Sequence, residues 1–290
     1  MTPTQARAFL AVATKGSFSE AARSLRVSQP TVTSQVKEIE KDYGIELFRR
    51  NGRGALLTPV GESLLPSIRR MFSSYEEANA LLSELNGMRR GTLRIGSYGP
   101  FDVIKIIGRY QRRFPSVTLS VDFSNSEILA AKLGNYDVDI AVLGRLKHQP
   151  QFYTLPFRQP PLIVIAPRNA KWDDRKSVSA AELKNEIIIR RERGSVAGAT
   201  HDRFIGRVKV PPSHIFQFGS REGVISAVAE GIGVATVIDE GYFPEDRIVK
   251  LKIDGPPLAS KVDVVCLADR CSSPLIADFI DIAKEIIRER

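Results

Sequence analysis

Cysteines, long apolar runs and a secretory leader are scarce or missing in this sequence. The chain has only two cysteines, Cys266 and Cys271, which are too few for a disulfide framework and fit a reducing compartment. No apolar run approaches the roughly 18 to 20 residues that a membrane-spanning helix needs. The N-terminus has no basic patch followed by an apolar stretch, so we expect no secretory signal. These absences predict a cytoplasmic protein without a membrane partner.

The motifs of common enzyme classes are also missing. No strand-like segment is followed by a Walker or dinucleotide-binding glycine loop, and no Gly-x-Ser-x-Gly motif occurs. The three histidines, His148, His201 and His214, do not have the spacing of metal ligands. We therefore expect neither a catalytic centre nor a cofactor, and an α/β enzyme stays an alternative.

Positive charge, in contrast, is abundant. The 290 residues carry a formal net charge of +9, with 43% hydrophobic and 26% charged residues. The length favours two or three compact units, and a basic excess favours a polyanionic partner such as nucleic acid. The excess is densest near the N-terminus, since residues 1–58 carry nine Lys or Arg against five Asp or Glu, whereas residues 59–90 are balanced.

Residues 17–36 read as two short helices joined by a tight turn. Ser17 and Glu20 have the Ser-x-x-Glu spacing of a capping box. Ser28, followed two residues later by Pro30, is typical of an N-cap with a first-turn proline. Two capped helices joined in this way form a helix-turn-helix, although such pairs also occur as ordinary solvated helices.

The second helix of this pair has one apolar and one polar face. Val32, Val36 and Ile39 recur at helical spacing and should face a core. The residues at its start and on its outward face are small, polar or basic: Ser28, Gln29, Pro30, Thr31, Thr33, Ser34 and Lys37. Such a face fits the major groove of double-stranded DNA and reaches base edges, so we predict that these residues bind DNA.

A basic hairpin is predicted after the helix pair. Residues 47–48 begin an extended run, residues 49–54 contain two glycines and read as the tip, and residues 55–57 form the return strand. The tip carries three arginines: Arg49, Arg50 and Arg53. Beside a helix-turn-helix, such a wing can contact phosphates or enter a narrow minor groove, whereas alone it would be an ordinary solvated turn.

A long helix is predicted after the hairpin. Thr58 and Pro59 have the arrangement of a helix start, and no effective breaker follows until Gly87, although Pro66 lies inside. Apolar residues in this stretch repeat at intervals of four and three: Leu64, Ile68, Met71, Tyr75, Ala78, Leu82 and Leu85. A single helix cannot bury such a seam, so we predict a homodimer that presents two recognition helices to a pseudo-palindromic site. A core helix of one domain is the alternative.

The rest of the chain alternates strand and helix patterns. We expect buried strands at residues 92–96, 117–123, 138–143, 162–166, 187–189, 234–238 and 262–267, and helices at residues 101–113, 128–133, 223–230 and 274–288. This alternation predicts parallel sheets with helices on their faces. About 200 residues exceed one small sheet, so we predict two α/β subdomains with a ligand cleft between them.

Four segments of this region place polar residues where strands end and helices begin, which is where open α/β folds bind ligands. Their hydroxyl, amide and guanidinium groups suit a carboxylate, phosphate or phosphonate, and Glu222 could meet an amine. The predicted effector residues are Ser97, Tyr98, Gly99, Pro100, Asn125, Ser126, Arg191, Arg193, Ser195, Arg221 and Glu222. Serine and asparagine at such places are also good helix caps, so each has a structural alternative.

Six short motifs follow one another along the N-terminal part of the chain, at residues 9–13, 16–18, 21–22, 28–30, 47–50 and 57–61. In this order they resemble the DNA-binding signature of the LysR-type transcriptional regulators, and the resemblance extends over essentially the whole chain. It implies a winged helix-turn-helix at residues 1–58, a dimerising linker helix and hinge at residues 59–90, and an α/β effector domain with the fold of periplasmic solute-binding proteins at residues 91–290. It further implies a homodimer or homotetramer, RNA polymerase as a partner and a bacterial, nucleoid-associated location.

Some residues narrow or qualify this resemblance. Where many members have Ala-Val-Ser-Arg after Ser-Gln-Pro, this chain has Thr31-Val32-Thr33-Ser34, and the missing arginine removes a phosphate or base contact. Residues 46–53, 125–126, 191–196 and 221–224 are similar to the branch associated with aminoethylphosphonate catabolism genes, which would make the effector an aminophosphonate.

Two alternative functions stay open. One is an architectural DNA-binding protein without ligand control, and the other is redox sensing through Cys266 and Cys271.

Overall fold

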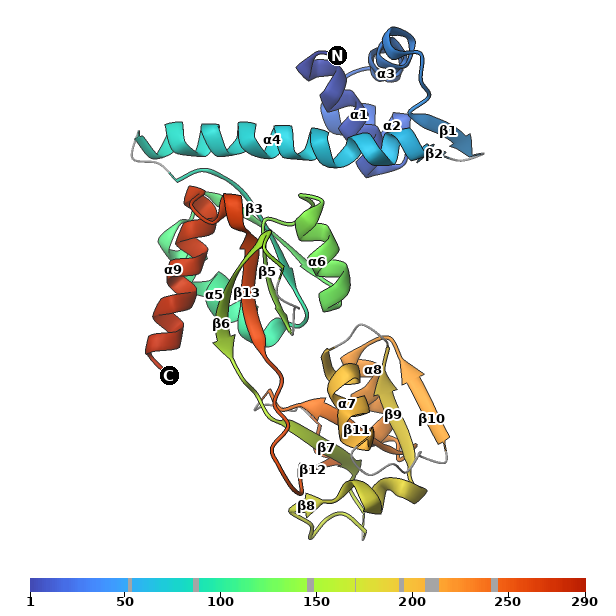
Figure 1. The fold of residues 1–290 in the computed structure, drawn as a ribbon, viewed down its shortest axis with the longest axis vertical. Coiled ribbons are helices and arrows are strands. Elements are labelled where there is room, and N and C mark those ends of the chain that lie inside the picture. The colour runs from blue at the N-terminus through green and yellow to red at the C-terminus, as the bar shows by residue number, and fades with distance from the viewer. Residues whose placement is uncertain are drawn as a thin grey trace. The chain divides into compact units, whose positions relative to one another are not determined.

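The computed structural model describes most of the chain: residues 1–51, 54–85, 89–144, 149–169, 171–192, 196–206, 214–240 and 245–290. These residues form two compact units, one made mainly by residues 1–86 and the other mainly by residues 87–290. Within this described part, no helix is long and apolar enough to cross a membrane. Figure 1 shows the helices and strands of both units.

Three short helices open the first unit (Figure 1). They are α1 (Pro3–Lys15), α2 (Phe18–Leu25) and α3 (Gln29–Tyr43). Thr2 starts α1, because its side chain and that of Gln5 form a reciprocal capping box. Gly16 ends α1 in the left-handed conformation, at φ 64°, where a residue without a Cβ is favoured.

α2, α3 and the turn between them form the predicted helix-turn-helix. Ser17 caps α2, but the Glu20 carboxylate pairs with Arg23, so only one half of the predicted capping box forms. Arg26 ends α2 in the left-handed conformation, at φ 56°. Ser28 then caps α3 by accepting a hydrogen bond from a backbone N–H in its first turn.

The three helices pack around a small apolar core. Val32, Val36 and Ile39 of α3 are each 1% exposed, which confirms the predicted inward face. They pack with apolar side chains of α1 and α2, among them Phe9 and Ala21. Burying a large apolar side chain contributes about 1.5–3 kcal/mol, so this core fixes the orientation in which α3 is presented.

A two-stranded hairpin follows α3. It consists of the antiparallel strands β1 (Phe48–Asn51) and β2 (Gly54–Leu57). Arg49 and Arg50 belong to β1, which corrects the prediction that they lie in the tip, because strand pairing continues as far as Asn51 and Gly54. The Ala55 N–H donates to the Gly16 carbonyl at 2.8 Å and so fastens the hairpin to the end of α1.

The 27-residue helix α4 (Pro59–Leu85) completes the first unit. Two residues of the predicted seam, Leu64 and Ile68, pack into the core of this same unit with Phe9 and Leu47. They are therefore not part of an open seam, which corrects their assignment. The later seam residues are exposed: Met71 by 39%, Tyr75 by 57%, Leu82 by 61% and Leu85 by 83%. The exposed part of the predicted seam thus begins at Met71.

The second unit contains two β-sheets, with the strand orders β4-β3-β5-β13-β6 and β10-β9-β11-β7-β12-β8. The five-stranded sheet consists of β3 (Gly91–Ser97), β4 (Val117–Phe123), β5 (Ile140–Gly144), β6 (Phe152–Arg158) and β13 (Val262–Leu267). The six-stranded sheet consists of β7 (Leu162–Pro167), β8 (Ser177–Val178), β9 (Ile187–Arg191), β10 (His214–Phe218), β11 (Val234–Ile238) and β12 (Ile248–Ile253). The prediction of two α/β subdomains is confirmed.

The strand directions correct the prediction of parallel sheets. β3 is parallel to β4 and β5, but β13 is antiparallel to β5 and to β6. In the six-stranded sheet, β7 is antiparallel to β11 and to β12. The chain leaves the first sheet through β6 and returns to it through β13, so these two neighbouring strands run in opposite directions.

Helices cover both faces of each sheet (Figure 1). On the five-stranded sheet, α5 (Pro100–Arg113) and α9 (Pro274–Arg288) pack together on one face and α6 (Ser126–Gly134) covers the other. On the six-stranded sheet, the helices are α7 (Val196–Gly206) and α8 (Arg221–Ala229). Successive residues of β7 face opposite sides, since Val164 packs with Phe204 of α7 and Ile165 packs with Val224 of α8.

Two crossing segments join the sheets. Residues 159–161 connect β6 to β7, and residues 254–261 connect β12 to β13. The segments run side by side, because the Leu162 N–H donates to the Leu258 carbonyl at 2.7 Å and the Ser260 N–H donates to the Pro160 carbonyl at 2.9 Å. We call this pair of segments the hinge.

A buried histidine makes the stability of the second unit depend on pH. His201 of α7 is 3% exposed, and its Nδ1 contacts the Thr236 hydroxyl of β11. Burial lowers the pKa of His201 from 6.5 to about 4. Between pH 6.5 and pH 4 the unfolded chain therefore binds a proton at His201 that the folded unit does not bind. The contribution of neutral His201 to stability is present above pH 6.5 and is lost as the pH falls toward 4. At pH 5 the loss is about 2 kcal/mol.

Urea unfolding of the full chain at pH 7 and at pH 5 measures this loss. We expect His201→Gln, which cannot titrate, to remove most of that difference of about 2 kcal/mol between the two pH values. The wild-type chain measured in the same buffers is the reference. An equal loss of stability in both proteins would contradict the assignment to His201.

Candidate nucleic-acid interface and effector cleft

The start and outer face of α3 form one polar surface, which we call the recognition surface. It consists of Ser28, Gln29, Pro30, Thr31, Thr33, Ser34 and Lys37. All of these are exposed except Thr33, which is partly buried. Because most of these side chains are short, the backbone of α3 can approach a groove closely, with hydroxyl, amide and ammonium groups at its surface.

Neighbouring side chains hold parts of the recognition surface in place. The Ser19 hydroxyl on α2 donates to Oε1 of Gln29 at 3.0 Å. The Ser34 hydroxyl donates to the Glu38 carboxylate at 3.0 Å, and Glu38 also accepts a hydrogen bond from Gln5 at 3.0 Å. Sequence reasoning missed Glu38, although its position four residues after Ser34 places both on one helix face. A negative charge therefore lies beside the predicted DNA contacts.

The hairpin is attached to α3 itself. The Glu40 carboxylate on α3 accepts the Leu47 N–H at 2.8 Å, just before β1 begins. Arg49 of β1 is exposed. The other two predicted wing contacts are Arg50 and Arg53. The structure places Arg50 in β1 without describing its side chain, and Arg53 lies outside the described residues. The anchored hairpin can thus present its arginine at a fixed orientation to α3.

A cleft of about 540 Å³ lies in the second unit, with walls from both sheets. Its lining residues are Tyr98, Gly99, Pro100, Phe123, Ser124, Asn125, Ile128, Arg191, Glu192, Gly219, Ser220, Arg221 and Glu222. Seven predicted effector residues are among them. Sequence reasoning missed the apolar pair Phe123 and Ile128 and the carboxylate of Glu192, each of which lies within two residues of one that it had selected.

Two other predicted effector residues, Ser97 and Ser126, are not among the residues that line this cleft. Ser97 is fully buried, and its hydroxyl donates to the Gly99 carbonyl at 2.6 Å. Ser126 is 6% exposed, and its hydroxyl accepts the Gly144 N–H at 3.0 Å. Both serines therefore shape the loops behind the cleft, which corrects their assignment. Two further candidates, Arg193 and Ser195, lie outside the described residues.

Three helices begin at the cleft. Ser220 caps α8 by accepting the Gly223 N–H at 2.9 Å, and Asn125 caps α6 by accepting the Ile128 N–H at 3.0 Å. Gly99 precedes α5 and provides no side-chain cap. The first N–H groups of α5, at the positive end of its dipole, therefore suit an anionic group of a ligand.

Two arginines and two glutamates provide the charge of the described lining. Arg191 forms a bidentate pair with its neighbour Glu192 at 2.7 and 2.8 Å. The Arg221 guanidinium donates to the Ile238 carbonyl at 3.1 Å and lies over the Phe101 ring at 5.2 Å. Burial lowers the pKa of Arg221, so an anion bound beside it would stabilise its charged form.

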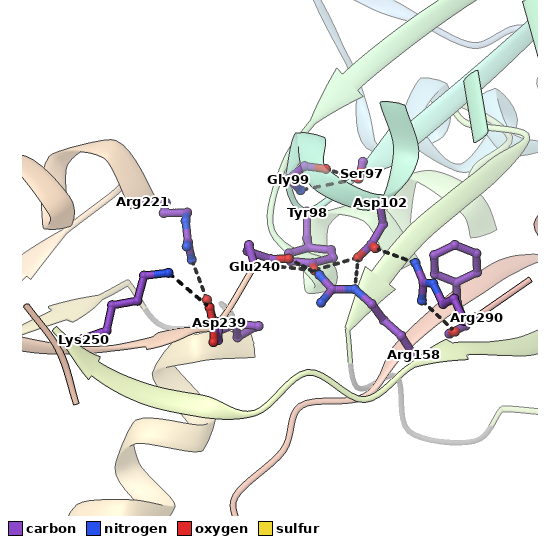
Figure 2. Close-up of polar contacts among 12 residues, drawn as sticks. Ser97, Tyr98, Gly99, Asp102, Arg158, Arg221, Asp239, Glu240, Lys250 and Arg290 are labelled. Atoms are coloured by element: carbon purple, nitrogen blue, oxygen red, sulfur yellow. Dashed lines mark hydrogen bonds and ion pairs between the residues drawn. The ribbon is translucent and has the colours of Figure 1, made fainter. Parts of the chain in front are cut away.

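The Tyr98 hydroxyl belongs to a buried polar cluster, shown in Figure 2. It lies 3.0 Å from a carboxylate oxygen of Glu240 and 3.3 Å from one of Asp102. Arg158 contacts the same two carboxylates, with its Nε 2.6 Å from Asp102. Burial and the carboxylate of Glu240 raise the pKa of Tyr98, which keeps its hydroxyl protonated. Sequence reasoning found neither Arg158 nor Glu240.

Among the described residues, the geometry favours neither a redox centre nor a metal site. Cys266 of β13 is fully buried, and burial raises the pKa of its thiol to about 12, so the reactive thiolate is not formed near neutral pH. Cys271 is partly exposed. Among the residues that the structure describes, no group of three or more His, Cys, Asp or Glu side chains is placed to hold a metal ion.

Two family models match the chain. Residues 3–62 match the bacterial regulatory helix-turn-helix protein, lysR family, and residues 86–288 match the LysR substrate binding domain. The first match includes the recognition surface and the hairpin, and the second includes the cleft.

Curated relatives and solved structures agree with these matches. The RuBisCO operon transcriptional regulator of Allochromatium vinosum is 31% identical over 258 residues, which cover 87% of this chain and 85% of that protein. The HTH-type transcriptional activator CmpR of Synechocystis is 28% identical, covering 96% of this chain and 93% of the relative. A full-length OxyR variant from Pseudomonas aeruginosa has a TM-score of 0.73 at 24% identity, covering 99% of this chain and 95% of that one. CbnR in complex with its target DNA has a TM-score of 0.71 at 19% identity, covering 98% and 99%. These structures share the fold.

Proposed function

Because the chain belongs to the LysR family of DNA-binding transcriptional regulators with an effector-binding domain, we propose that it binds a specific operator through α3 and the hairpin under the control of a small anionic effector. The relatives are transcriptional regulators and not enzymes, so the enzyme alternative is dropped. The family's effector domain also disfavours a purely architectural role. The observation that carries the proposal is the capped, exposed α3 in the first unit, together with a polar cleft in the second.

The recognition surface and the basic hairpin are the proposed contacts to double-stranded DNA. Gln29, Thr31 and Thr33 would read base edges, and Lys37 and Arg49 would contact phosphates. The remaining proposed contacts are Ser28, Pro30, Ser34, Arg50 and Arg53. Ser34 replaces an arginine that is common in the family, and its hydroxyl donates a hydrogen bond to the Glu38 carboxylate at 3.0 Å, so we propose an operator that differs from those of relatives.

The exposed part of α4 supports a homodimer. Met71, Tyr75, Leu82 and Leu85 would pack against a second copy, which aligns two recognition surfaces with a pseudo-palindromic operator. We propose residues 1–58, 59–90 and 91–290 as the DNA-binding, linker and effector domains. Pairing of dimers into a homotetramer, contact with RNA polymerase and a location in the bacterial cytoplasm complete the proposal.

The cleft supports an anionic effector. The uncapped start of α5 and Arg221 both offer positive charge to its interior, and Phe123 and Ile128 offer apolar contact. The other proposed contacts are Tyr98, Gly99, Pro100, Asn125, Arg191 and Glu222. None of the relatives described above is named for aminoethylphosphonate genes, so that narrower identity gains no support and the effector is proposed only as a small anion.

Calorimetric titration of the full chain tests the effector. The panel consists of inorganic phosphate, sulfate, acetate, citrate and aminoethylphosphonate. At least one anion should bind, and Arg221→Gln should weaken that binding by about tenfold or more, because it removes a charge-assisted contact. Arg203→Gln, an exposed arginine of α7 outside the cleft, is the matched control and should change nothing. No heat with any anion, or equal affinity in both variants, would sink the proposal.

The target genes have one specific candidate. One relative is named as a RuBisCO operon regulator and a second as a probable RuBisCO transcriptional regulator, at 31% and 30% identity. We therefore propose carbon-fixation genes as the first promoters to examine. Binding to DNA upstream of such genes in the source genome tests this assignment.

A further inference from the structure

We propose, on the basis of the effector function proposed above, that Glu240 and Arg158 form a latch between the two sheets of the second unit, and that this latch positions Tyr98 in the cleft and couples effector binding to closure of the hinge. Glu240 is thus assigned as a positioning residue of the effector site.

The partners of Glu240 lie on the other side of the cleft. Glu240 follows β11 of the six-stranded sheet, and its side chain is 1% exposed. The hydrogen bonds of its carboxylate reach Tyr98, which follows β3, and Arg158, which ends β6. Figure 2 shows the three side chains converging from the two sides. The contact is therefore made only when the two subdomains are close together.

Arg158 is held from its own side as well. Its Nε donates to Asp102 of α5 at 2.6 Å, and the Asp102 side chain is only 5% exposed. Arg290 contributes a longer contact of 3.5 Å to the same carboxylate. When the subdomains separate, Arg158 keeps the carboxylate of Asp102, whereas Glu240 loses both of its hydrogen-bond partners and keeps only the electrostatic attraction of Arg221 on its own side. The two halves of the latch are therefore unequal, and Glu240 is the half that must be rehydrated.

This inequality makes the latch reversible. A buried ion pair gains attraction in a medium of low dielectric constant but loses hydration of both charges, so the two contributions nearly cancel. Burial, together with the carboxylate of Asp102, raises the pKa of Glu240 in spite of the neighbouring Arg158, in line with a desolvation cost of the contact. A latch of this kind stabilises the closed form only slightly over the open form, so a ligand can shift the equilibrium between them.

The cleft and the latch share residues. Tyr98 lines the cleft and donates toward Glu240, and Arg221 lines the cleft and lies over Phe101 of the opposite side at 5.2 Å. A ligand that contacts Tyr98 and Arg221 therefore touches two residues that already bridge the sheets. Such a ligand binds the closed form more tightly, and by linkage it favours closure.

The latch also lies beside the hinge. Arg158 immediately precedes the crossing segment at residues 159–161. The Asp239 N–H donates to the Pro161 carbonyl at 2.9 Å, next to Glu240 in the sequence. A small rotation about the hinge would move Glu240 relative to Arg158, so the ion pair responds directly to the motion that opens the cleft.

Distances between spin labels on the two sides of the cleft test the latch without any ligand. The labels are placed on the full chain at Glu127→Cys in α6 and Ser226→Cys in α8, which are exposed positions outside the cleft lining, with Cys271→Ser to prevent labelling there. We expect Glu240→Gln to broaden the distance distribution and shift it toward longer distances. Glu230→Gln is the matched control, since its exposed pair with Arg247 lies on the six-stranded side alone, and it should leave the distribution unchanged.

A second variant and a second readout keep the test decisive. Tyr98→Phe removes only the hydroxyl and should shift the spin-label distances in the same direction, but by a smaller amount. This variant tests the latch even if Glu240→Gln does not fold. With inorganic phosphate as the probe, calorimetry should show about threefold to tenfold weaker binding to Glu240→Gln than to Glu230→Gln. Unchanged distance distributions in both latch variants overturn the latch. If no anion of the calorimetric panel binds the wild-type chain while the distances shift, the latch stands and only the anionic effector is lost.

Discussion

Reversing the charge of Lys37 and Arg49 together is expected to weaken operator binding by about 100-fold or more. Both side chains are exposed, one on α3 and one on β1, and each is proposed to contact a phosphate. The change removes two cations and adds two anions next to the DNA backbone, where the carboxylate of Glu38 already lies beside the recognition surface. Electrostatic contacts of this kind provide a large share of protein–DNA affinity.

Fluorescence anisotropy at several salt concentrations measures this effect. The probe is a duplex that the wild-type chain has selected from random sequence. Losing two phosphate contacts should lower the slope of log affinity against log salt by about 1.8. Lys105→Glu with Lys184→Glu, two exposed lysines of the second unit, is the control of equal charge change. A similar loss of affinity in the control would show that net charge, and not the recognition surface, determines binding.

Removing the carboxylate of Asp139 is expected to destabilise the second unit by about 3–5 kcal/mol. Asp139 is 4% exposed and accepts hydrogen bonds from Arg94 at 2.8 and 3.0 Å and from Arg270 at 2.7 Å. Burial alone would raise the pKa of Asp139, but the two arginines outweigh it and hold the pKa below its usual value. Asp139→Ala therefore deprives two guanidinium groups of the anion that faces them.

Urea unfolding near pH 7 compares this variant with a surface control. Asp122 pairs with Lys132, and both side chains are at least one third exposed, so Asp122→Ala should cost no more than about 1 kcal/mol. Because the folded pKa of Asp139 is lowered, its contribution is present at neutral pH and is lost as the pH falls below the unfolded value. Equal destabilisation by the two variants would contradict the assigned role.

Local signals determined how well the first unit could be predicted. The caps Ser17 and Ser28 act within four residues of their partners, and Val32, Val36 and Ile39 repeat at helical spacing. Such signals are complete within one short segment. The boundaries of the helix-turn-helix could therefore be predicted from the sequence, whereas the packing of Leu64 and Ile68 into that domain could not.

The second unit shows what a linear pattern cannot provide. Buried strands such as β11 and β13 stand out as apolar runs, and their bounds match the prediction. β4 also has the predicted bounds, but only Val117 of its residues is buried, so the expectation of a buried strand there is wrong. The strands β6 and β12 alternate polar and apolar residues and were missed, because Pro156 and two lysines interrupt them. Strand direction depends on where the chain crosses between sheets, so the antiparallel pairing of β13 required the three-dimensional structure.

The candidate sites also could be predicted only in part from the sequence. Residues after a strand or before a helix, such as Tyr98, Asn125 and Arg221, can be selected by position alone, and they line the cleft. Position does not tell whether a hydroxyl faces the cleft or the loop behind it, as Ser97 and Ser126 demonstrate. Glu240 is 142 residues from Tyr98 in the sequence, and no local pattern links the two.

Hydroxyl-radical footprinting on the selected duplex tests the central claim most directly, namely that α3 of a dimer reads the operator. The full wild-type chain should protect two patches whose centres lie about one helical turn, or a multiple of it, apart. Gln29→Ala with Thr31→Ala should remove that protection at concentrations where the wild-type chain is saturating. A single unpaired patch would contradict the dimer, and a footprint unchanged in the double variant would contradict recognition through α3.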